Sequence, residues 1–201
     1  MPGKIKFLYF DLGGVFFHWK HFPQVFSQRF GNTPQNWQRV FDKYDTPACL
    51  GKMTPPELWQ KFQQELNFRA DPSLDFTDLW SDFYIPIPKT AKLVTELSSV
   101  YKIGILSDIF QGIFAKYIPK GIIPDLPYSP VIESCNVGFR KPHLEIFNFA
   151  LTKSGYKAEE ILFIDDNSVN TAAAQKLGWN TVTFDEWQPK KSIAEIKAKL
   201  V

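Results

Sequence analysis

The chain has 201 residues, 44% of them hydrophobic and 22% charged, a composition typical of a folded globular protein rather than a disordered one. Its 23 lysines and arginines nearly balance its 21 aspartates and glutamates, so we expect no broad basic surface for nucleic acid or an anionic membrane. This length suits one domain, or a core domain that carries a modest insertion.

Short apolar segments predict the strands of a buried sheet. They are Lys4–Phe10, Lys102–Leu106, Ile161–Ile164 and Thr181–Phe184, with Ser129–Glu133 as a weaker fifth. Each segment is too short for a stable helix. Apolar runs without alternation are typical of parallel strands that are covered on both faces.

Helical patterns with recognisable ends separate these strands. We expect helices over residues 89–100, 142–154 and 168–177, and Ser192–Glu195 has the pattern of a capping box that begins a last helix. Strands that alternate with helices predict an α/β fold. The expected architecture is Rossmann-like, with a mainly parallel sheet and helices on both of its faces.

Residues 18–88 interrupt this alternation. The segment holds four of the six tryptophans and eight of the 15 prolines, and we expect no strand in it. Helices are predicted over residues 34–44, from Thr54 onward and over residues 74–84, and Thr54–Glu57 is a strong helix start. We therefore predict a core domain of residues 1–17 and 89–201, with a small all-helical cap of residues 18–88 inserted after the first strand.

Polar residues follow the ends of three predicted strands. Asp11 follows the first strand, Ser107 and Asp108 follow the second, and Asp165 and Asp166 follow another. Ligands of doubly wound sheets bind beyond the carboxyl ends of the strands. Carboxylates gathered at one edge repel one another unless a cation neutralises them, and oxygen ligands beside a phosphate favour Mg²⁺. The sequence thus predicts a magnesium site at this edge.

Four motifs in this order resemble those of the haloacid dehalogenase-like hydrolase superfamily. They are Tyr9–Val15 (YFDLGGV), Ile105–Asp108 (ILSD), Gly138–Pro142 (GFRKP) and Phe163–Gly178 (FIDDNSVNTAAAQKLG), and together they span nearly the whole chain. The closer similarity is to the branch that contains glucose-1-phosphate phosphatases and the phosphatase domain of soluble epoxide hydrolase. In that branch a small cap follows the first motif.

The resemblance implies a Mg²⁺-dependent phosphatase that acts on a small phosphorylated metabolite such as a sugar phosphate. Asp11 would attack phosphorus and form an aspartyl-phosphate, while Ser107 and Lys141 would bind the phosphoryl oxygens. Asp11, Asp165 and the backbone carbonyl of Gly13 would hold the magnesium ion. Supporting positions in this arrangement are Asp166, Asp108, Gly14 and Asn170.

Gly13 departs from the pattern of the superfamily. Its phosphatases usually carry a second aspartate two residues after the nucleophile, which protonates the leaving oxygen and then activates water. A positioned acid contributes about 10²–10⁴-fold to a rate, so we expect slower turnover here. Candidate substitutes are Asp108, His18, a metal-bound water, or a leaving group that needs no acid, and the sequence leaves all four open.

Two other functions compete with the phosphatase. One is a metal-independent haloacid dehalogenase that uses Asp11 against carbon, which the adjacent acids Asp165 and Asp166 disfavour. The other is an inactive phosphate-binding regulatory protein that lost the acid at position 13. The complete set of Asp11, Ser107, Lys141 and Asp165 argues against such decay.

The remaining features predict a cytoplasmic protein. The apolar stretch Phe7–Phe10 is too short for a signal peptide, and no segment approaches the length of a membrane span. Cys49 and Cys135 stand in no metal-binding spacing, so we expect two reduced thiols. The expected partner is a small phosphorylated substrate, with no nucleic acid and no membrane, and the oligomeric state is left open.

Overall fold

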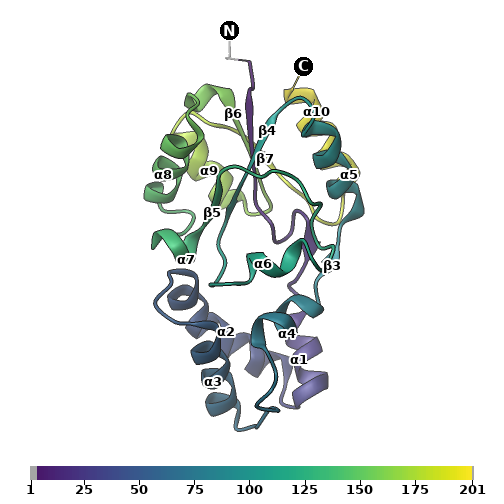
Figure 1. Cartoon of the computed structure of the whole chain (residues 1–201), viewed down its shortest axis with the longest axis vertical. Coiled ribbons are helices and arrows are strands. Elements are labelled where there is room, and N and C mark those ends of the chain that lie inside the picture. The colour runs from purple at the N-terminus through teal and green to yellow at the C-terminus, as the bar shows by residue number, and fades with distance from the viewer. Residues whose placement is uncertain (1–3, 201) are drawn as a thin grey trace.

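A five-stranded parallel sheet forms the centre of the larger part of the molecule (Figure 1). The computed structural model describes residues 4–200. In spatial order the strands are β5 (Val131–Glu133), β4 (Lys102–Ser107), β1 (Phe7–Phe10), β6 (Ile161–Asp165) and β7 (Asn180–Thr183). All four pairings are parallel, and the chain passes from one side of β1 to the other between β5 and β6. That reversal places a ligand-binding crevice at the carboxyl end of β1.

Helices cover both faces of this sheet, as the alternating pattern of strands and helices predicts (Figure 1). Phe7 and Tyr9 of β1 pack on the side of α8 (Leu144–Ser154) and α9 (Ser168–Lys176). Leu8 and Phe10 point to the opposite face and pack on the side of α5 (Pro88–Leu97) and α10 (Pro189–Lys199). The predicted α/β fold with a parallel sheet is confirmed. No helix within residues 4–200 is long and apolar enough to span a membrane.

Two predicted helix starts are wrong. Helix α10 begins at Pro189 and not at Ser192, because the Ser192 hydroxyl accepts a hydrogen bond from the Asp185 amide (2.8 Å) and holds the preceding loop. Helix α8 begins at Leu144 and not at Pro142, since residues 141–143 form a turn instead. Three short helical elements complete this part of the chain: α6 (Phe114–Tyr117), α7 (Ser134–Val137) and a 3₁₀ turn at Ala158–Glu160.

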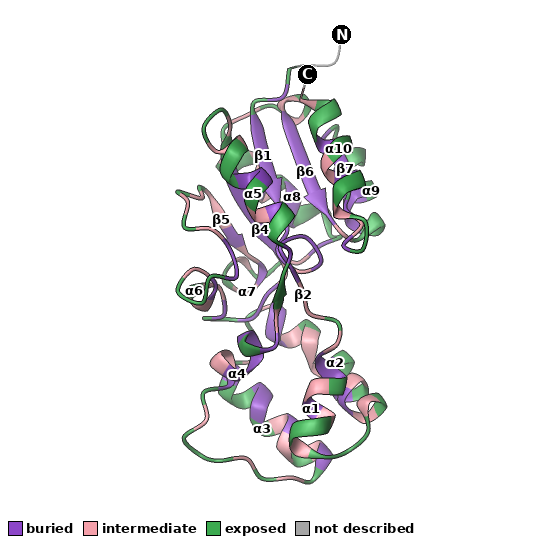
Figure 2. Cartoon of the chain, turned by 90° about the vertical axis from the view of Figure 1, so that its right-hand side faces the viewer, coloured by how far each residue is buried: buried purple, intermediate pink, exposed green. Residues whose placement is uncertain are grey.

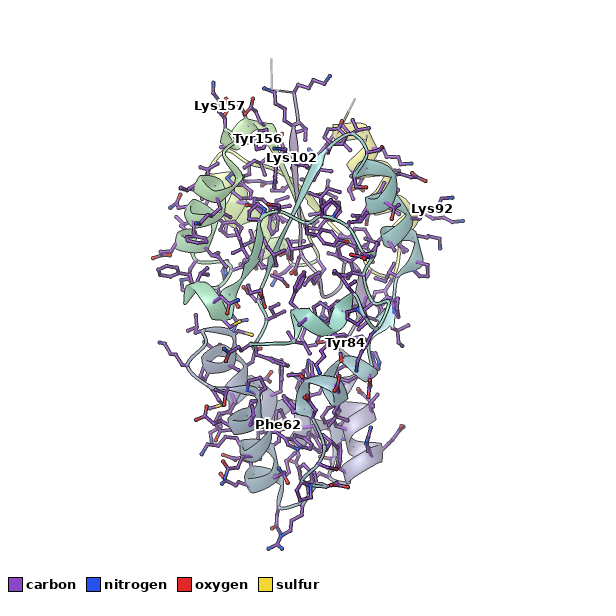
Figure 3. The ribbon with its side chains drawn as sticks, in the orientation of Figure 1. Phe62, Tyr84, Lys92, Lys102, Tyr156 and Lys157 are labelled. Carbon is purple, nitrogen blue, oxygen red and sulfur yellow. The ribbon has the colours of Figure 1, made fainter. Side chains whose placement is uncertain are left out.

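A separate group of helices lies beyond the carboxyl edge of the sheet (Figure 1). Its members are α1 (Phe22–Phe30), α2 (Pro34–Cys49), α3 (Pro55–Leu66) and α4 (Phe76–Asp82). Their shared core is aromatic: Trp37 packs on Phe62 at 5.4 Å and Phe26 on Trp80 at 5.5 Å between ring centroids. Figure 3 shows Phe62 among the side chains of these helices.

Local sequence determines the start of α3. The Thr54 hydroxyl accepts a hydrogen bond from the Glu57 amide (3.4 Å), and the Glu57 carboxylate accepts one from the Thr54 amide (2.7 Å). This reciprocal pair satisfies two backbone donors that the first turn of a helix leaves free. The predicted helix start at Thr54 is confirmed, and a capping box forms it. Helix α1 has no comparable signal, and the sequence did not predict it.

The expectation that residues 18–88 contain no strand is wrong at both ends of that segment. β2 (Phe17–His18) pairs antiparallel with β3 (Ile85–Pro86), and the Ile87 amide donates to the Phe16 carbonyl (2.7 Å). Two residues are too few to produce a recognisable sequence pattern, so only the tertiary contact defines these strands. Figure 2 shows this connection as a narrow neck between the sheet and the helices.

Candidate active site

The carboxyl ends of β1 and β4 open into a pocket of about 450 Å³ between the sheet and the helices α1–α4. Figure 3 shows Tyr84, which lines the pocket, at this junction. Most of the predicted site residues come together here, and those that line the pocket are Asp11, Gly13, Ser107, Asp108, Lys141, Asp166 and Asn170. Asp165 is fully buried within contact distance of Lys141.

Lys141 is the central cation of the site. Its Nζ lies 3.0 Å from Asp11 Oδ1 and 2.6 Å from Asp165 Oδ2, and it donates a hydrogen bond to the Leu106 carbonyl (3.1 Å). Burial acts to lower the pKa of Lys141, but the charges of Asp11, Asp165 and Asp108 outweigh it and raise the pKa above its ordinary value. Lys141 is therefore a permanent positive charge, with a side chain that is 1% exposed.

Asp11 presents an oxygen that is not satisfied by hydrogen bonds. Its Oδ1 is buried and forms the ion pair with Lys141, yet it accepts no hydrogen bond. Burial raises the pKa of Asp11 to about 7, and the charges of Asp165 and Asp166 act in the same direction, while Lys141 and a hydrogen bond from Ser107 oppose them. Lys141 already supplies one positive charge, and the oxygen keeps lone pairs that can bind a metal ion or attack a reacting group.

Asp165 is held in place by the start of α9. Its Oδ1 accepts a hydrogen bond from the Asn167 amide (2.8 Å), and the Asn170 side chain donates to both carboxylate oxygens at 3.1 Å. The Lys141 ammonium group also donates a hydrogen bond to Asp165 Oδ2. The structure thus assigns Asn170 a contact with Asp165 and none with Asp11.

Three carboxylates are close enough to share one metal ion. Asp11, Asp165 and Asp166 each place an oxygen within 4.8 Å of the others. All-oxygen donor sets suit Mg²⁺, and Asp11, whose Oδ1 accepts no hydrogen bond, is one of the three residues. The residues present therefore fit a magnesium ion. Lys20 lies at the edge of this group, with its Nζ 2.6 Å from Asp166 Oδ2.

Position 14 requires glycine because the backbone there passes close to the Asp166 side chain. Gly14 has a φ of +71°, which favours glycine, and a Cβ on it would lie 2.3 Å from Asp166 Oδ2. The glycine thus allows the loop after β1 to pass directly beside the acidic group.

Gly13 faces a side chain that the sequence reasoning did not single out. A Cβ at position 13 would lie 2.7 Å from Trp19 Nε1 and 2.9 Å from Trp19 Cδ1. The Trp19 indole therefore fills the space that an aspartate at this position would enter. No sequence motif identifies Trp19, because its contact with Gly13 depends on the path that the chain takes after β1.

The two side chains considered as substitutes for the missing acid differ in position. Asp108 lines the pocket; its Oδ1 accepts a hydrogen bond from the Lys141 amide (3.0 Å), and burial raises its pKa against the opposing charges of Lys141 and Arg140. His18 lies outside the pocket lining, with Nδ1 2.8 Å from Glu186 and its ring stacked on Trp187. The geometry therefore does not support His18 as the acid.

Comparisons with known proteins point to one family. The family model described as haloacid dehalogenase-like hydrolase matches residues 10–178. The chain is 36% identical over 100 residues to glyceraldehyde 3-phosphate phosphatase of Methanocaldococcus jannaschii, a match that covers 48% of this chain and 43% of that protein. The match therefore spans less than half of the length of that relative.

Two further similarities extend over nearly the whole chain. Sesquiterpene phosphatase astK of Aspergillus oryzae is 23% identical over 195 residues, which cover 89% of each protein. A HAD family enzyme from Bacteroides thetaiotaomicron, solved in complex with magnesium and inorganic phosphate, has a TM-score of 0.72 at 23% identity; the match covers 90% of this chain and 94% of that chain. This structural similarity shows the shared fold. Together with the family model, which matches more than half of the residues, it leads to one conclusion: the chain belongs to the haloacid dehalogenase-like hydrolase family.

Proposed function

We propose that this protein is a Mg²⁺-dependent phosphomonoesterase that acts on a small phosphorylated metabolite through an aspartyl-phosphate on Asp11. The observation that carries this proposal is the buried, unsatisfied Asp11 Oδ1 beside Lys141 and two further carboxylates. Two relatives named as phosphatases, and a structural neighbour that holds magnesium and phosphate, support it. Residues 18–88 would act as a cap over the pocket.

The reaction has two steps. An Asp11 oxygen attacks phosphorus in line, the bond between phosphorus and the alcohol oxygen breaks, and the alcohol oxygen leaves with the electron pair and takes a proton from solvent water. Water then attacks the phosphorus of the aspartyl-phosphate, releasing inorganic phosphate and restoring Asp11. Both steps use the same phosphoryl position, which the Ser107 hydroxyl and the Lys141 ammonium group would contact.

The magnesium ion would be held by Asp11, Asp165 and the Gly13 carbonyl, with Asp166 beside it. When bound, the ion would neutralise negative charge on the phosphoryl oxygens. The chain's own contribution is to keep the groups in place: Asn170 orients Asp165, and Lys141 holds Asp11 and Asp165 at 3.0 Å and 2.6 Å. Because Gly13 supplies no proton, phosphate esters with acidic leaving groups should react fastest.

The test is hydrolysis of 4-nitrophenyl phosphate with Mg²⁺ and with excess EDTA, for the unchanged protein, Asp11→Asn and the exposed control Asp71→Asn. We expect Asp11→Asn to lower kcat by at least about 10⁴-fold, and EDTA to do so comparably, with Asp71→Asn unaffected. Activity that survives Asp11→Asn would contradict the covalent mechanism. Activity in EDTA would contradict the role of the metal, and phosphate binding without any turnover would favour the regulatory alternative.

A further inference from the structure

Five apolar side chains line part of the pocket beside Asp11. Phe41 of α2 and Trp80 of α4 belong to the helices, while Ile109, Phe110 and Ile113 follow β4. These five side chains are called the apolar wall below, and the part of the pocket that they line is called its apolar end. Because the wall draws on both parts of the molecule, a bound molecule would touch the sheet part at its phosphate and both parts at its remainder.

The apolar wall is preformed and rigid. Phe41 stacks on Trp80 with ring centroids 5.5 Å apart and planes 13° apart, and Phe110 meets Trp80 edge-on, also at 5.5 Å. Each of these rings is less than a tenth exposed. Rings that are packed against one another in this way present a fixed carbon surface, which favours an apolar ligand of matching shape.

The charged groups at this end of the pocket are already paired. Arg140 Nη1 donates to Asp45 Oδ2 and to Thr46 Oγ1, both at 2.8 Å, and Arg140 Nε lies 3.5 Å from Asp108 Oδ2. The Cys49 thiol donates to Asp45 Oδ1 (3.3 Å). These side chains neutralise one another's charge, so this part of the pocket offers a ligand no unpaired charge.

Two tyrosines, Tyr84 and Tyr117, also line the pocket, and the Tyr117 hydroxyl is buried without a hydrogen-bond partner. Burial raises the pKa of both tyrosines, so both stay neutral. A sugar carries several hydroxyls, and each one loses its bound water on binding unless a protein group forms a hydrogen bond to it. The carbon surface of the apolar wall offers no such hydrogen bond.

We infer that the leaving group of the substrate is an apolar ring or branched hydrocarbon alcohol, about the size of a monosaccharide ring, and not a polyhydroxylated sugar. This inference rests on the proposed phosphomonoesterase function. The phosphate would lie at Asp11, Ser107 and Lys141, and the carbon skeleton would extend along the apolar wall. The ester oxygen would lie between the two ends.

The test compares two phosphates that share a primary alcohol and a six-membered ring. Cyclohexylmethyl phosphate has no hydroxyl on its ring, whereas glucose 6-phosphate has four. With Mg²⁺ present, kcat/KM should favour cyclohexylmethyl phosphate by at least about 100-fold, because an apolar pocket discriminates against an added hydroxyl by about that factor. Equal values, or a preference for glucose 6-phosphate, would overturn the inference while the proposed function stands.

Variants of the apolar wall separate recognition from folding. Phe41→Asn should lower the ratio of the two kcat/KM values by about tenfold, and the conservative Phe41→Leu should largely preserve it. Acetyl phosphate, whose leaving group is too small to reach the wall, reports the phosphoryl end alone, and the exposed control Asp71→Asn should hydrolyse it as the unchanged protein does. Thermal unfolding checks that both Phe41 variants are folded.

Two outcomes are decisive against the inference. An unchanged ratio in folded Phe41→Asn would show that the apolar wall does not contact the leaving group. Failure to hydrolyse acetyl phosphate, 4-nitrophenyl phosphate and both ring phosphates would overturn the proposed function itself, and the inference with it. The acetyl phosphate result therefore distinguishes failure of the chemistry from failure of the substrate assignment.

Discussion

The carboxyl edge of the sheet and the helices α1–α4 bury opposite kinds of side chain. The sheet edge buries charge, with Lys141 between Asp11 and Asp165. The helices bury rings such as Trp37 and Phe62, and their ion pairs lie on the outside. Buried charges cost free energy and persist only where each is paired, whereas buried rings stabilise by area alone. Under the proposed function, the sheet edge would perform the chemistry, and the helices would contribute Phe41 and Trp80 to the surface that selects the molecule.

Lys141→Met should give the largest effect, because it breaks the charge arrangement of the sheet edge. Asp11 and Asp165 would then be buried without their cation, which costs about 3–5 kcal/mol of unfolding free energy. The loss of a fixed positive group at the phosphoryl position should also lower kcat about 10²–10³-fold. Urea unfolding in EDTA and steady-state kinetics with Mg²⁺ measure the two effects.

Lys20→Met is the matched control for this change. Lys20 also contacts the acidic group, at 2.6 Å from Asp166, but its side chain is 56% exposed. Exposed ion pairs contribute at most about 1 kcal/mol, so this variant should lose little stability. Equal losses in Lys20→Met and Lys141→Met would show that burial does not distinguish the two cations.

Gly13→Asp should not restore the missing acid. Its side chain would collide with the Trp19 indole, so kcat/KM on an alkyl phosphate should fall by about tenfold or more instead of rising. The measurement is a comparison of alkyl and 4-nitrophenyl phosphates. A rise in Gly13→Asp alone would show that the indole is no obstacle.

The double change Gly13→Asp with Trp19→Ala should give the opposite result. Compared with Trp19→Ala alone, we expect alkyl phosphate hydrolysis to rise by up to about 10²-fold, since space for the acid is then available. Hydrolysis of 4-nitrophenyl phosphate, whose leaving group needs less protonation, should change much less.

Asp45→Asn tests the link between the two parts. It removes the charge partner of Arg140 on α2, so closure over the substrate should weaken and KM should rise roughly threefold to tenfold with little change in kcat. Asp78→Asn is the control, because Asp78 of α4 pairs with Lys116 and Lys120 of the sheet part without lining the pocket. A similar rise in KM for both variants would indicate general loosening.

Glu65→Gln should give the smallest effect, and it should change the thermal stability but not the activity. Hydrogen bonds from Lys43 and then Tyr44 lower the pKa of Glu65 from 4.5 to about 2. A lowered pKa means that this stabilisation is present above about pH 4.5 and is lost as the pH falls toward 2. The Tm difference between the unchanged protein and Glu65→Gln should be about 1–2 °C at pH 6 and vanish near pH 2. A Tm difference that does not change with pH would show that the hydrogen bonds to the Glu65 carboxylate are not its cause.

The sheet edge was largely predictable from sequence because each of its acids follows its strand directly. Asp11 and Asp165 end apolar runs, and the rule that parallel strands share a carboxyl edge brings them together. Asp11 and Asp165 also fall within the first and fourth of the four motifs, so the resemblance to the family could be recognised from the sequence alone. The helices were less predictable: α1 lacks a capping signal, and β2 and β3 are too short to leave a pattern.

The sequence by itself determined the parallel sheet, the order of its strands in the chain, the start of α3 and the residue types at the acidic edge, because these depend on neighbouring residues and on periodicity. Tertiary structure alone decided three further features: the contact between Trp19 and Gly13, the pairing of Arg140 with Asp45, and the apolar wall in the pocket that holds Asp11. Each joins residues from different elements, and no local rule relates such positions. The sequence shows at position 13 only that a carboxylate is missing. The structure shows in addition that the Trp19 indole occupies the space which that carboxylate would need.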